Sequence, residues 1–364
     1  MQLDHVRMEC LQIPFKQSFS HAAATRQSTE TVIVTAVSRN GSIAYGEGCP
    51  RYYVTGETIA SALQFFEKNK QDAMTIQDLH DLKQWVNTHA TEIDQNAAAW
   101  CAIELALLDL LAKQSHQSVE ALLGLPELCG SFQYSAVLGS ESLAAYTTQL
   151  QHYLHRGFTD FKVKVCSDFA QNRDKIALLR DHIKPLTVRL DANNLWSDAQ
   201  QASAYIQNLN YPFRAIEEPL TVNDHAGCRN IHNALQTPII LDESFLHHAQ
   251  FDHLIEDPQT WIINLRVSKM GGLLRSLAIA ETARELSIPL IIGAQVGETS
   301  ILTRAALTVA NACRDLIIAQ EGAFGTYLLQ YDITDQPVMF GRKGKLDASG
   351  FRGKGGFAID YQRL

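Results

Sequence analysis

Short apolar runs alternate with stretches of helical periodicity between about residues 130 and 326. The runs are Phe132–Leu138, Phe161–Val165, Leu186–Leu190, Arg214–Ile216, Pro238–Leu241, Trp261–Leu265, Pro289–Ile292 and Leu316–Ala319. Most of them lack regular polar alternation, which is typical of parallel strands that are covered on both faces. Eight such strands, separated by helices, can close into a (β/α) barrel, so the pattern predicts an α/β fold of this type.

The first 128 residues follow a different pattern. Strand-like segments come first, among them Thr31–Val37, and a turn at Asn40-Gly41 is typical of a β-hairpin. Helices follow, and the longest is predicted to begin near Asn96. Strands followed by helices predict an α+β domain.

The last part of the chain, residues 331–364, is rich in glycine and shows no helical periodicity. It ends in a strand-like apolar segment, Gly356–Asp360, which we expect to return to the first domain. The sequence therefore predicts an α+β capping domain over residues 1–128, a catalytic barrel over 129–330, and a C-terminal segment over 331–364 that completes the cap.

Composition narrows the class of protein. Of 364 residues, 46% are hydrophobic and 19% are charged, a balance that excludes a disordered chain. The 39 acidic residues outnumber the 31 basic ones, and the net charge of −8 disfavours nucleic acid as a partner. We expect no membrane span, no signal peptide and, from seven scattered cysteines, no disulfide framework. These features predict a cytoplasmic protein.

Polar side chains stand at the C-terminal ends of five consecutive predicted barrel strands. They are Lys164, Asp191, Glu217, Asp242 and Lys269, and each is separated from the next by 25 to 27 residues. One (β/α) unit takes about that many residues, so the five side chains should lie at one level on the catalytic rim of the barrel.

Three of these residues are candidate metal ligands. Asp191, Glu217 and Asp242 follow adjacent strands, and three carboxylates cannot all stay ionised so close together without a cation. Oxygen ligands of this kind favour Mg²⁺, with Mn²⁺ as an alternative. A single carboxylate at a strand end is more often a helix cap or an ion-pair partner, and it is the shared spacing that favours a joint site.

The two lysines lie on strands four apart, so Lys164 and Lys269 are predicted to face each other across an eight-stranded barrel. The metal and the neighbouring Lys162 should favour the neutral amine of Lys164, which could then act as a base. Removal of a proton α to a carboxylate builds an enediolate, and a bound dication would stabilise its charge. Two opposed lysines could remove and return that proton on opposite faces, which is the chemistry of a racemase.

The same residues carry a resemblance to a known family. Lys162-x-Lys164, the three acids and Lys269-Met270-Gly271-Gly272 resemble motifs of the muconate lactonizing enzyme subgroup of the enolase superfamily. The resemblance implies a (β/α)₇β TIM-type barrel with an N-terminal α+β capping domain, and binding of Mg²⁺. It also implies that Lys164 and Lys269 are the acid/base pair and that Lys162 supports charge stabilisation.

Specificity should come from the capping loops and from the last two barrel strands. A loop over Phe19–Thr29 offers His21 and Arg26, and Arg26 is a candidate for binding a second anion. Glu298 and Glu321 follow strands seven and eight and are further candidate substrate-binding residues. The Asp-x-Asp motif that is usual in similar dipeptide epimerases is missing, and so is the Glu-Leu-Phe-Gly of muconate cycloisomerases.

These features predict a Mg²⁺-dependent racemase or epimerase that acts on a small-molecule carboxylate such as an N-acyl amino acid or a dipeptide. The alternative within the superfamily is a cycloisomerase or a syn-dehydratase, which needs only one lysine for proton transfer. A Schiff-base aldolase and a non-catalytic binding module are the alternatives from other classes. A homo-oligomer is expected because it is common among similar proteins.

Overall fold

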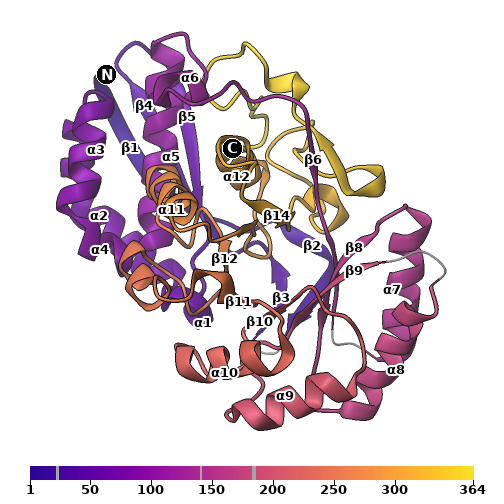
Figure 1. Cartoon of the computed structure of the whole chain (residues 1–364). Helices are drawn as coiled ribbons and strands as arrows, with labels where there is room; N and C mark the ends of the chain where they lie inside the picture. Colours follow the sequence, from indigo (N-terminus) through magenta and orange to yellow (C-terminus); the bar gives the residue numbers. More distant parts are fainter. Residues whose placement is uncertain (22–23, 140–141, 183–185) are drawn as a thin grey trace.

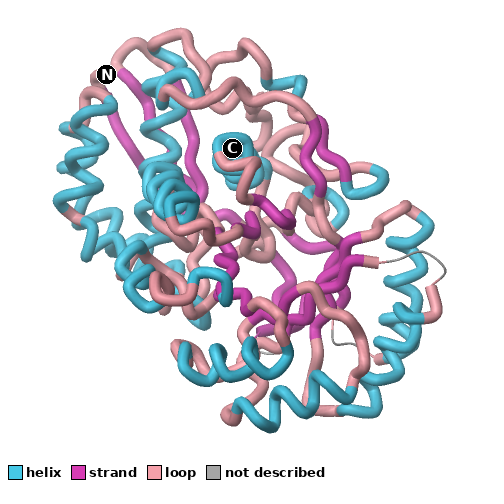
Figure 2. The backbone as a smooth tube through the Cα atoms, in the orientation of Figure 1, coloured by secondary structure: helices cyan, strands magenta, loops and turns pink. Residues whose placement is uncertain are grey.

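The computed structural model describes residues 1–21, 24–139, 142–182 and 186–364 (Figure 1). The N-terminal part forms an α+β unit that packs beside a larger unit in which strands and helices alternate. Figure 2 shows the strands of the larger unit gathered near the centre of the molecule, with helices around them. The two units agree with the architecture that the sequence predicts.

The N-terminal unit is built on a three-stranded antiparallel sheet. Its strands, in spatial order, are β1 (Leu3–Leu11), β4 (Thr31–Ser38) and β5 (Ile43–Gly48). The predicted hairpin is confirmed, since β4 and β5 pair directly and Gly41 has the left-handed φ of 83° that glycine adopts without steric cost.

Helices follow the sheet in the chain. They are α1 (Tyr52–Thr55), α2 (Ile59–Thr75), α3 (Leu79–Thr88), α4 (Ala90–Asp94), α5 (Ala97–Gln114) and α6 (Val119–Leu123). Of these, α2 and α5 pack against the strands of the sheet. The predicted long helix is α5, which begins after Asn96. It lies so close to β5 that a Cβ atom on Gly48 would stand 1.9 Å from the Ala98 carbonyl oxygen. Glycine in the strand and alanine in the helix permit this approach.

The larger unit contains an eight-stranded parallel sheet in sequential order. Its strands are β7 (Ala136–Leu138), β8 (Asp160–Lys164), β9 (Thr187–Asp191), β10 (Ala215–Glu217), β11 (Ile239–Leu241), β12 (Trp261–Leu265), β13 (Leu290–Ile292) and β14 (Ile317–Gln320). The amide of Ser135 donates to the Gln320 carbonyl at 2.8 Å and so brings the two outer strands together. The predicted α/β barrel is confirmed.

The helices between these strands are α7 (Leu143–His155), α8 (Phe169–Arg180), α9 (Ala199–Asn208), α10 (His225–Leu235), α11 (Leu273–Glu285) and α12 (Ser300–Ala312). Short 3₁₀ turns complete the described part: η1 (His248–His253), η2 (Pro258–Thr260), η3 (Gly325–Tyr327), η4 (Arg342–Gly344) and η5 (Ser349–Phe351). Inside the sheet, a small apolar cluster fills the barrel below the polar strand ends: Ala215, Ile240, Ile262, Ile291 and Ala319.

The first predicted barrel strand, Phe132–Leu138, is wrong as a single element. Its first half is β6 (Ser131–Gln133), which pairs antiparallel with β15 (Lys345–Asp347), and only its second half is β7. In β6, the exposed Ser131 and Gln133 flank the buried Phe132. This alternation suits a strand with one solvated face, outside the barrel.

The C-terminal segment does reach the first domain, but the expected strand over Gly356–Asp360 is not formed. The segment meets the domain at a bridge between Ser118 and Gly356, beside which the Phe357 amide donates to Asp109 Oδ1 at 2.8 Å, and at the Tyr361 ring, which packs on Tyr45. Because a carboxylate from α5 satisfies this amide, no second strand is needed to hold the buried Phe357 in place.

The expected loop over Phe19–Thr29 is instead part of a hairpin. Strands β2 (Pro14–His21) and β3 (Ala24–Ser28) pair antiparallel. The backbone of Lys16 donates to Leu328, which follows β14, and so fastens the hairpin to the barrel. Residues 22 and 23 and the side chain of His21 lie outside the described residues.

Two buried carboxylates fasten the capping sheet and helix to the barrel. Glu47, on β5, accepts hydrogen bonds from the Thr299 amide, the Thr299 hydroxyl and the Leu302 amide at the start of α12. Glu104, on α5, accepts from the Leu274 amide at the start of α11. Burial raises the pKa of each to about 7, while the amides at the helix starts favour the ionised form.

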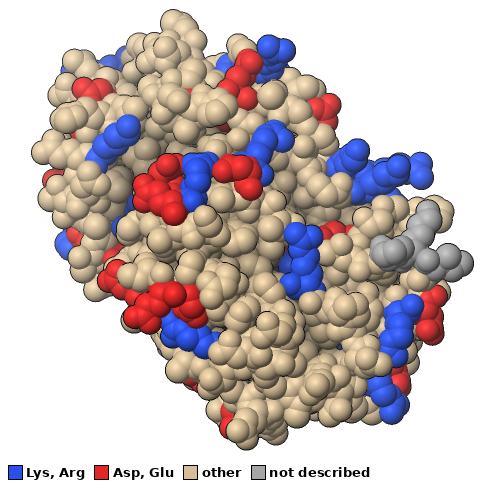
Figure 3. Space-filling model, viewed as in Figure 1, with Lys and Arg blue, Asp and Glu red and all other residues tan. Residues whose placement is uncertain are grey.

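The outer surface carries both signs of charge. On the face drawn in Figure 3, lysines and arginines are interspersed with acidic side chains. Within the described ranges, no helix combines the length and the apolar character needed to span a bilayer.

Candidate active site

The candidate site lies where the parallel strands end. Lys164 is the last residue of β8, Asp191 of β9 and Glu217 of β10, and the three are neighbours in the sheet register. Asp242 comes one residue after β11, and Arg266 one residue after β12. The shared spacing in the sequence therefore does place a group of charged side chains at one end of the barrel.

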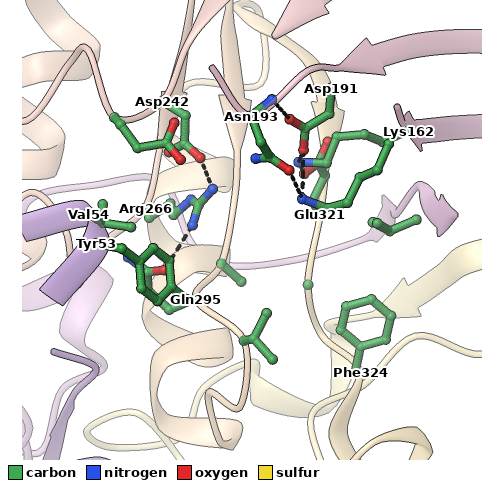
Figure 4. A pocket seen from close by; sticks show the side chains of 16 residues that line it. Tyr53, Val54, Lys162, Asp191, Asn193, Asp242, Arg266, Gln295, Glu321 and Phe324 are labelled. Atoms are coloured by element: carbon green, nitrogen blue, oxygen red, sulfur yellow. Dashed lines mark hydrogen bonds and ion pairs between the residues drawn. The ribbon is translucent and has the colours of Figure 1, made fainter. Parts of the chain in front are cut away.

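A cavity of about 90 Å³ opens at this end of the barrel. Figure 4 shows Lys162, Asp191 and Glu321 on one side of it, with Asp242 and Arg266 on the other. Tyr53 and Val54 from α1 reach the cavity from the capping domain. The site is therefore shared between barrel and cap.

Lys162 lies at the centre of a buried ionic network. Its Nζ lies 2.6 Å from Glu321 Oε2, 3.2 Å from Glu217 Oε2 and 3.6 Å from Asp191 Oδ2. Burial lowers the pKa of Lys162, but Glu217, Glu321 and Asp191 outweigh it and the pKa is raised overall. This lysine is therefore a fixed cation that draws three carboxylates together.

Lys164 projects into the cavity beside the same network. Its Nζ lies 3.0 Å from Asp191 Oδ2 and donates to Asn193 Oδ1 at 2.8 Å. Burial alone would raise the pKa of Asp191, but Lys164 and Lys162 together lower it to about 2. Asp191 is thus ionised at neutral pH and positions the amine of Lys164.

Lys269 does not face Lys164 in the structure. Its side chain is fully buried, and its Nζ donates to the Asp242 carbonyl, to Asp242 Oδ1 at 2.9 Å and to the Asn264 carbonyl. It is not among the residues that line the cavity. Burial, and then the Arg266 guanidinium, lower the pKa of Lys269 well below its usual value.

Arg266 occupies the place opposite Lys164 that the sequence analysis gave to Lys269. Its guanidinium lines the cavity, pairs with Asp242 Oδ2 and donates to Gln295 Oε1 at 2.8 Å (Figure 4). The physical reason is where the strand ends: β12 stops at Leu265, so Arg266 stands on the rim while Lys269 lies three residues further along the turn.

Glu321 lines the cavity, as expected of a residue at the end of strand eight, but it is already paired. Lys162 holds Oε2, and Arg189 donates to Oε1 at 3.1 Å. Arg26 pairs with Glu30, and its guanidinium carbon lies 5.7 Å from the centre of the Tyr53 ring. Arg26 is therefore near the cavity mouth but is not one of the residues that line it.

Glu298 is half-buried and is not one of the residues that line the cavity. Its Oε1 accepts from the Gln295 amide at 2.6 Å. Burial, with a smaller contribution from the charge of Glu47, raises the pKa of Glu298 to about 8. The Glu298 carboxyl therefore contacts the backbone of Gln295, which lines the cavity, but does not itself line the cavity.

We predict that Glu298→Gln flattens the pH dependence of stability. Between the usual glutamate value of 4.5 and about 8, the folded protein retains a proton that the unfolded chain has lost. Stability therefore falls as pH rises through this window, by up to about 1.4 kcal/mol per pH unit for one group. The substituted amide keeps the acceptor oxygen and has no proton to lose, so denaturation midpoints from pH 5 to 8 should fall less steeply.

The exposed Glu285, at the end of α11, provides the matched control for that experiment. Glu285→Gln should keep the slope of the parent protein. Equal slopes for Glu298→Gln and the parent would show that Glu298 does not hold its proton at neutral pH.

The donor set at the strand ends suits a hard divalent cation. Asp191 and Glu217 already share one ammonium group, and Asp242 follows the next strand with its carboxylate held by Arg266 and Lys269. Among the described residues, no three His, Cys, Asp or Glu side chains are already gathered as a coordination shell. The acids are oxygen donors held by cations, and a dication at the same place would replace these cations as their partner.

Several residues of the site were not predicted from the sequence. Arg266, Gln295, Asn193 and Glu243 line the cavity, and Arg189 holds Glu321 from inside the barrel. The sequence does contain a signal for Arg266, because this residue directly follows an apolar run that predicts a barrel strand. Gln295 and Asn193 lie in turns after strands, where a polar residue is the rule and carries no specific signal.

A parallel barrel with acids and amines at the C-terminal strand ends, covered by an α+β domain, has the architecture of a barrel enzyme. A model of the mandelate racemase/muconate lactonizing enzyme N-terminal domain matches residues 5–124, and a model of the enolase C-terminal domain-like family matches residues 145–355. The chain therefore belongs to the enolase superfamily, in the group of muconate lactonizing enzyme-like proteins, as its motifs predict.

Individual relatives agree with this placement. An L-Ala-D/L-Glu epimerase from Francisella tularensis subsp. novicida is 29% identical over 84% of this chain and 86% of its own length. An N-succinyl-L-Arg/Lys racemase from Bacillus cereus is 23% identical over 85% of this chain and 84% of its own. The solved dipeptide epimerase from Enterococcus faecalis, complexed with Mg and the dipeptide L-Leu-L-Tyr, shares the fold with a TM-score of 0.85 at 24% identity, covering 99% of this chain and 100% of that one.

Proposed function

We propose that the protein is a divalent-metal-dependent isomerase, a racemase or epimerase that removes the proton α to a carboxylate. The observation that carries the proposal is the amine of Lys164 beside the carboxylate of Asp191, with Asp242 in the same cavity at the catalytic end of the barrel. The activities named for the relatives support an N-acyl amino acid or a dipeptide as the substrate class.

Asp191, Glu217 and Asp242 are the proposed ligands of Mg²⁺, with Mn²⁺ as an alternative. The Mg complexes of solved relatives support this choice of ion. When bound, the ion would supply positive charge where the substrate carboxylate gains negative charge as the proton leaves. The protein's own part is to hold three acids from adjacent strands at one level.

In this proposal, Lys164 is the general base. Its Nζ is held by Asp191 and Asn193 at the cavity wall, so the amine is positioned before substrate arrives. Lys162 stays protonated between its three acids and adds a fixed positive charge next to the developing negative charge. Proton transfer and charge stabilisation thus fall to two different lysines of one strand.

Racemisation also needs a proton donor on the opposite face, and Lys269 is the proposed residue. Burial lowers its pKa well below the usual value, which makes its ammonium form a stronger proton donor. To act, however, Lys269 has to leave its contacts with Asp242 and Asn264. Binding of a cation by Asp242 would remove one of these contacts.

A cycloisomerase or a syn-dehydratase is the second candidate, and the position of Arg266 favours it. An arginine faces Lys164 across the cavity, and a guanidinium does not give up a proton at physiological pH. A cycloisomerase or a syn-dehydratase transfers a proton on only one face of the substrate, and Lys164 alone is sufficient for that transfer. The two candidates differ in the role of Lys269 and in the stereochemistry of exchange.

The proposal predicts incorporation of deuterium at the α-carbon when the Mg²⁺-loaded protein acts in D₂O. Proton NMR would follow N-acyl amino acids, dipeptides, muconates and acid sugars. Exchange with inversion identifies a racemase or epimerase, and Lys269→Ala should then exchange without inverting. A new double bond or lactone identifies the second candidate. No exchange in any compound would remove the proposed function.

We further propose that the protein acts in the cytoplasm on small molecules rather than on nucleic acid. All seven cysteines are free, four of them buried, which suits a reducing compartment. The net charge of −8 supports a partner other than nucleic acid. Assembly as a homo-oligomer remains a prediction from the resemblance alone.

A further inference from the structure

The proposed function would change the contacts of Arg266 more than those of any other residue that lines the cavity. Its guanidinium carries a charge that stays positive at any physiological pH. It is held on two sides, by the Asp242 carboxylate and by Gln295 Oε1 at 2.8 Å. Its side chain is only 13% exposed, so the charge has little water around it.

The proposed function assigns Asp242 to the metal, and Arg266 would then lose its only charged partner among the described contacts. Glu217, Glu298 and Glu321 act on this charge from further away, but none of them forms an ion pair with it, and a nearly buried cation without a directly bound anion is disfavoured. Gln295 compensates only in part, because an amide oxygen carries no full charge. Another anion in direct contact with Arg266 would therefore stabilise this wall when the metal is bound.

The guanidinium also presents an incompletely used edge. Nη2 contacts Asp242, while Nε on the same edge is buried and has no hydrogen-bond partner among the described residues. Two parallel N–H groups on one edge match the two oxygens of a carboxylate. Once Asp242 turns to a metal, both donors of that edge are available to a ligand.

From these observations we propose that Arg266 binds a second anionic group of the substrate, a carboxylate distinct from the one next to the reacting carbon. The inference rests on the proposed function and narrows its substrate class to dicarboxylates, such as an amino acid acylated by a dicarboxylic acid. Arg266 becomes the specificity-determining residue of the pocket. Arg26, the candidate from the sequence, already pairs with Glu30 outside the cavity lining.

Glu243 is the competing feature of the same cavity. It lines the wall, and its buried Oε2 has no hydrogen-bond partner among the described residues. An ammonium group on the substrate could bind there. A substrate selected by Glu243 would carry a positive group where one selected by Arg266 carries a negative one.

Three matched ligands separate these possibilities: N-succinyl-, N-butyryl- and N-β-alanyl-L-leucine. They share the leucine carboxylate and end the acyl chain in a carboxylate, a methyl group or an ammonium group. Affinities for the Mg²⁺-loaded protein would be measured by calorimetry, and α-proton exchange in D₂O by NMR. The parent should bind the succinyl compound at least about tenfold more tightly than the butyryl compound.

The preference for the succinyl compound should disappear in Arg266→Gln. It should be reduced in Arg266→Lys, because lysine keeps the positive charge but lacks the two parallel N–H donors of the guanidinium. Arg26→Gln should keep the full preference, which makes it the matched arginine control. Circular dichroism would verify that each variant is folded. Equal binding or no binding of the succinyl and butyryl compounds by the parent overturns the inference.

Two further results would also overturn it. Tightest binding of the β-alanyl compound would assign selectivity to Glu243, and loss of preference in Arg26→Gln rather than Arg266→Gln would assign it to Arg26. Failure of the proposed function looks different, since the succinyl preference would persist in the binding data while none of the ligands exchanged its α-proton.

Discussion

Lys164→Ala should lower the rate of α-proton exchange by about a thousandfold, within the range that a general base contributes. The amine of Lys164 is held at the cavity wall by Asp191 and Asn193, and the opposite wall carries Arg266, which cannot replace a base. NMR in D₂O would measure the exchange. The variant should stay folded and still bind Mg²⁺, because the three proposed ligands remain.

The control for this experiment is a lysine that is also paired with an acid but lies far from the cavity. Lys68 fits, since its Nζ pairs with Glu92 at 2.7 Å and its side chain is 70% exposed. Lys68→Ala should exchange at the parental rate. If Lys164→Ala does the same, Lys164 is not the base, whatever the reaction.

Asp242→Asn should weaken Mg²⁺ binding by at least about tenfold, as expected when one charged oxygen ligand of a metal site is neutralised. The reason is loss of negative charge at a place where Arg266 and Lys269 already compete with the cation. Calorimetry on the metal-free protein would measure the affinity. Loss of α-proton exchange at low Mg²⁺, with recovery at high Mg²⁺, should accompany it.

Asp257 offers a matched control for that substitution. It is an aspartate paired with an arginine, Arg229, but it precedes β12 and so lies at the other end of the barrel. Asp257→Asn should leave the Mg²⁺ affinity as in the parent. Unchanged affinity in Asp242→Asn would remove Asp242 from the proposed ligands.

The sequence was sufficient to predict the barrel and most of the charged rim. Lys164, Asp191, Glu217 and Asp242 were predicted to lie at one level, because equal spacing in a (β/α) repeat means equal height in the barrel. The same criterion failed for Lys269. The length of a (β/α) unit varies by a few residues. Spacing alone therefore cannot distinguish Arg266, the first residue after its strand, from Lys269, which lies three positions later.

Other features depend on contacts that no local pattern encodes. The division of Phe132–Leu138 into β6 and β7 follows from pairing with β15, more than 200 residues later in the chain. Arg189 appeared as an ordinary residue of an apolar strand, yet it lies inside the barrel and holds Glu321 and Ser135. An isolated charge in such a strand is a useful signal of a partner inside the barrel.

In the proposed reaction, Lys164 removes a proton next to a carboxylate, and the three acids hold the divalent cation on which this step depends. The most direct test is the rate of α-proton loss in D₂O from a compound that exchanges, followed in one sample before chelation, after chelation and after Mg²⁺ is added back. We predict exchange that stops with the chelator and returns with Mg²⁺. Exchange that continues at the full rate in the metal-free protein would contradict the account.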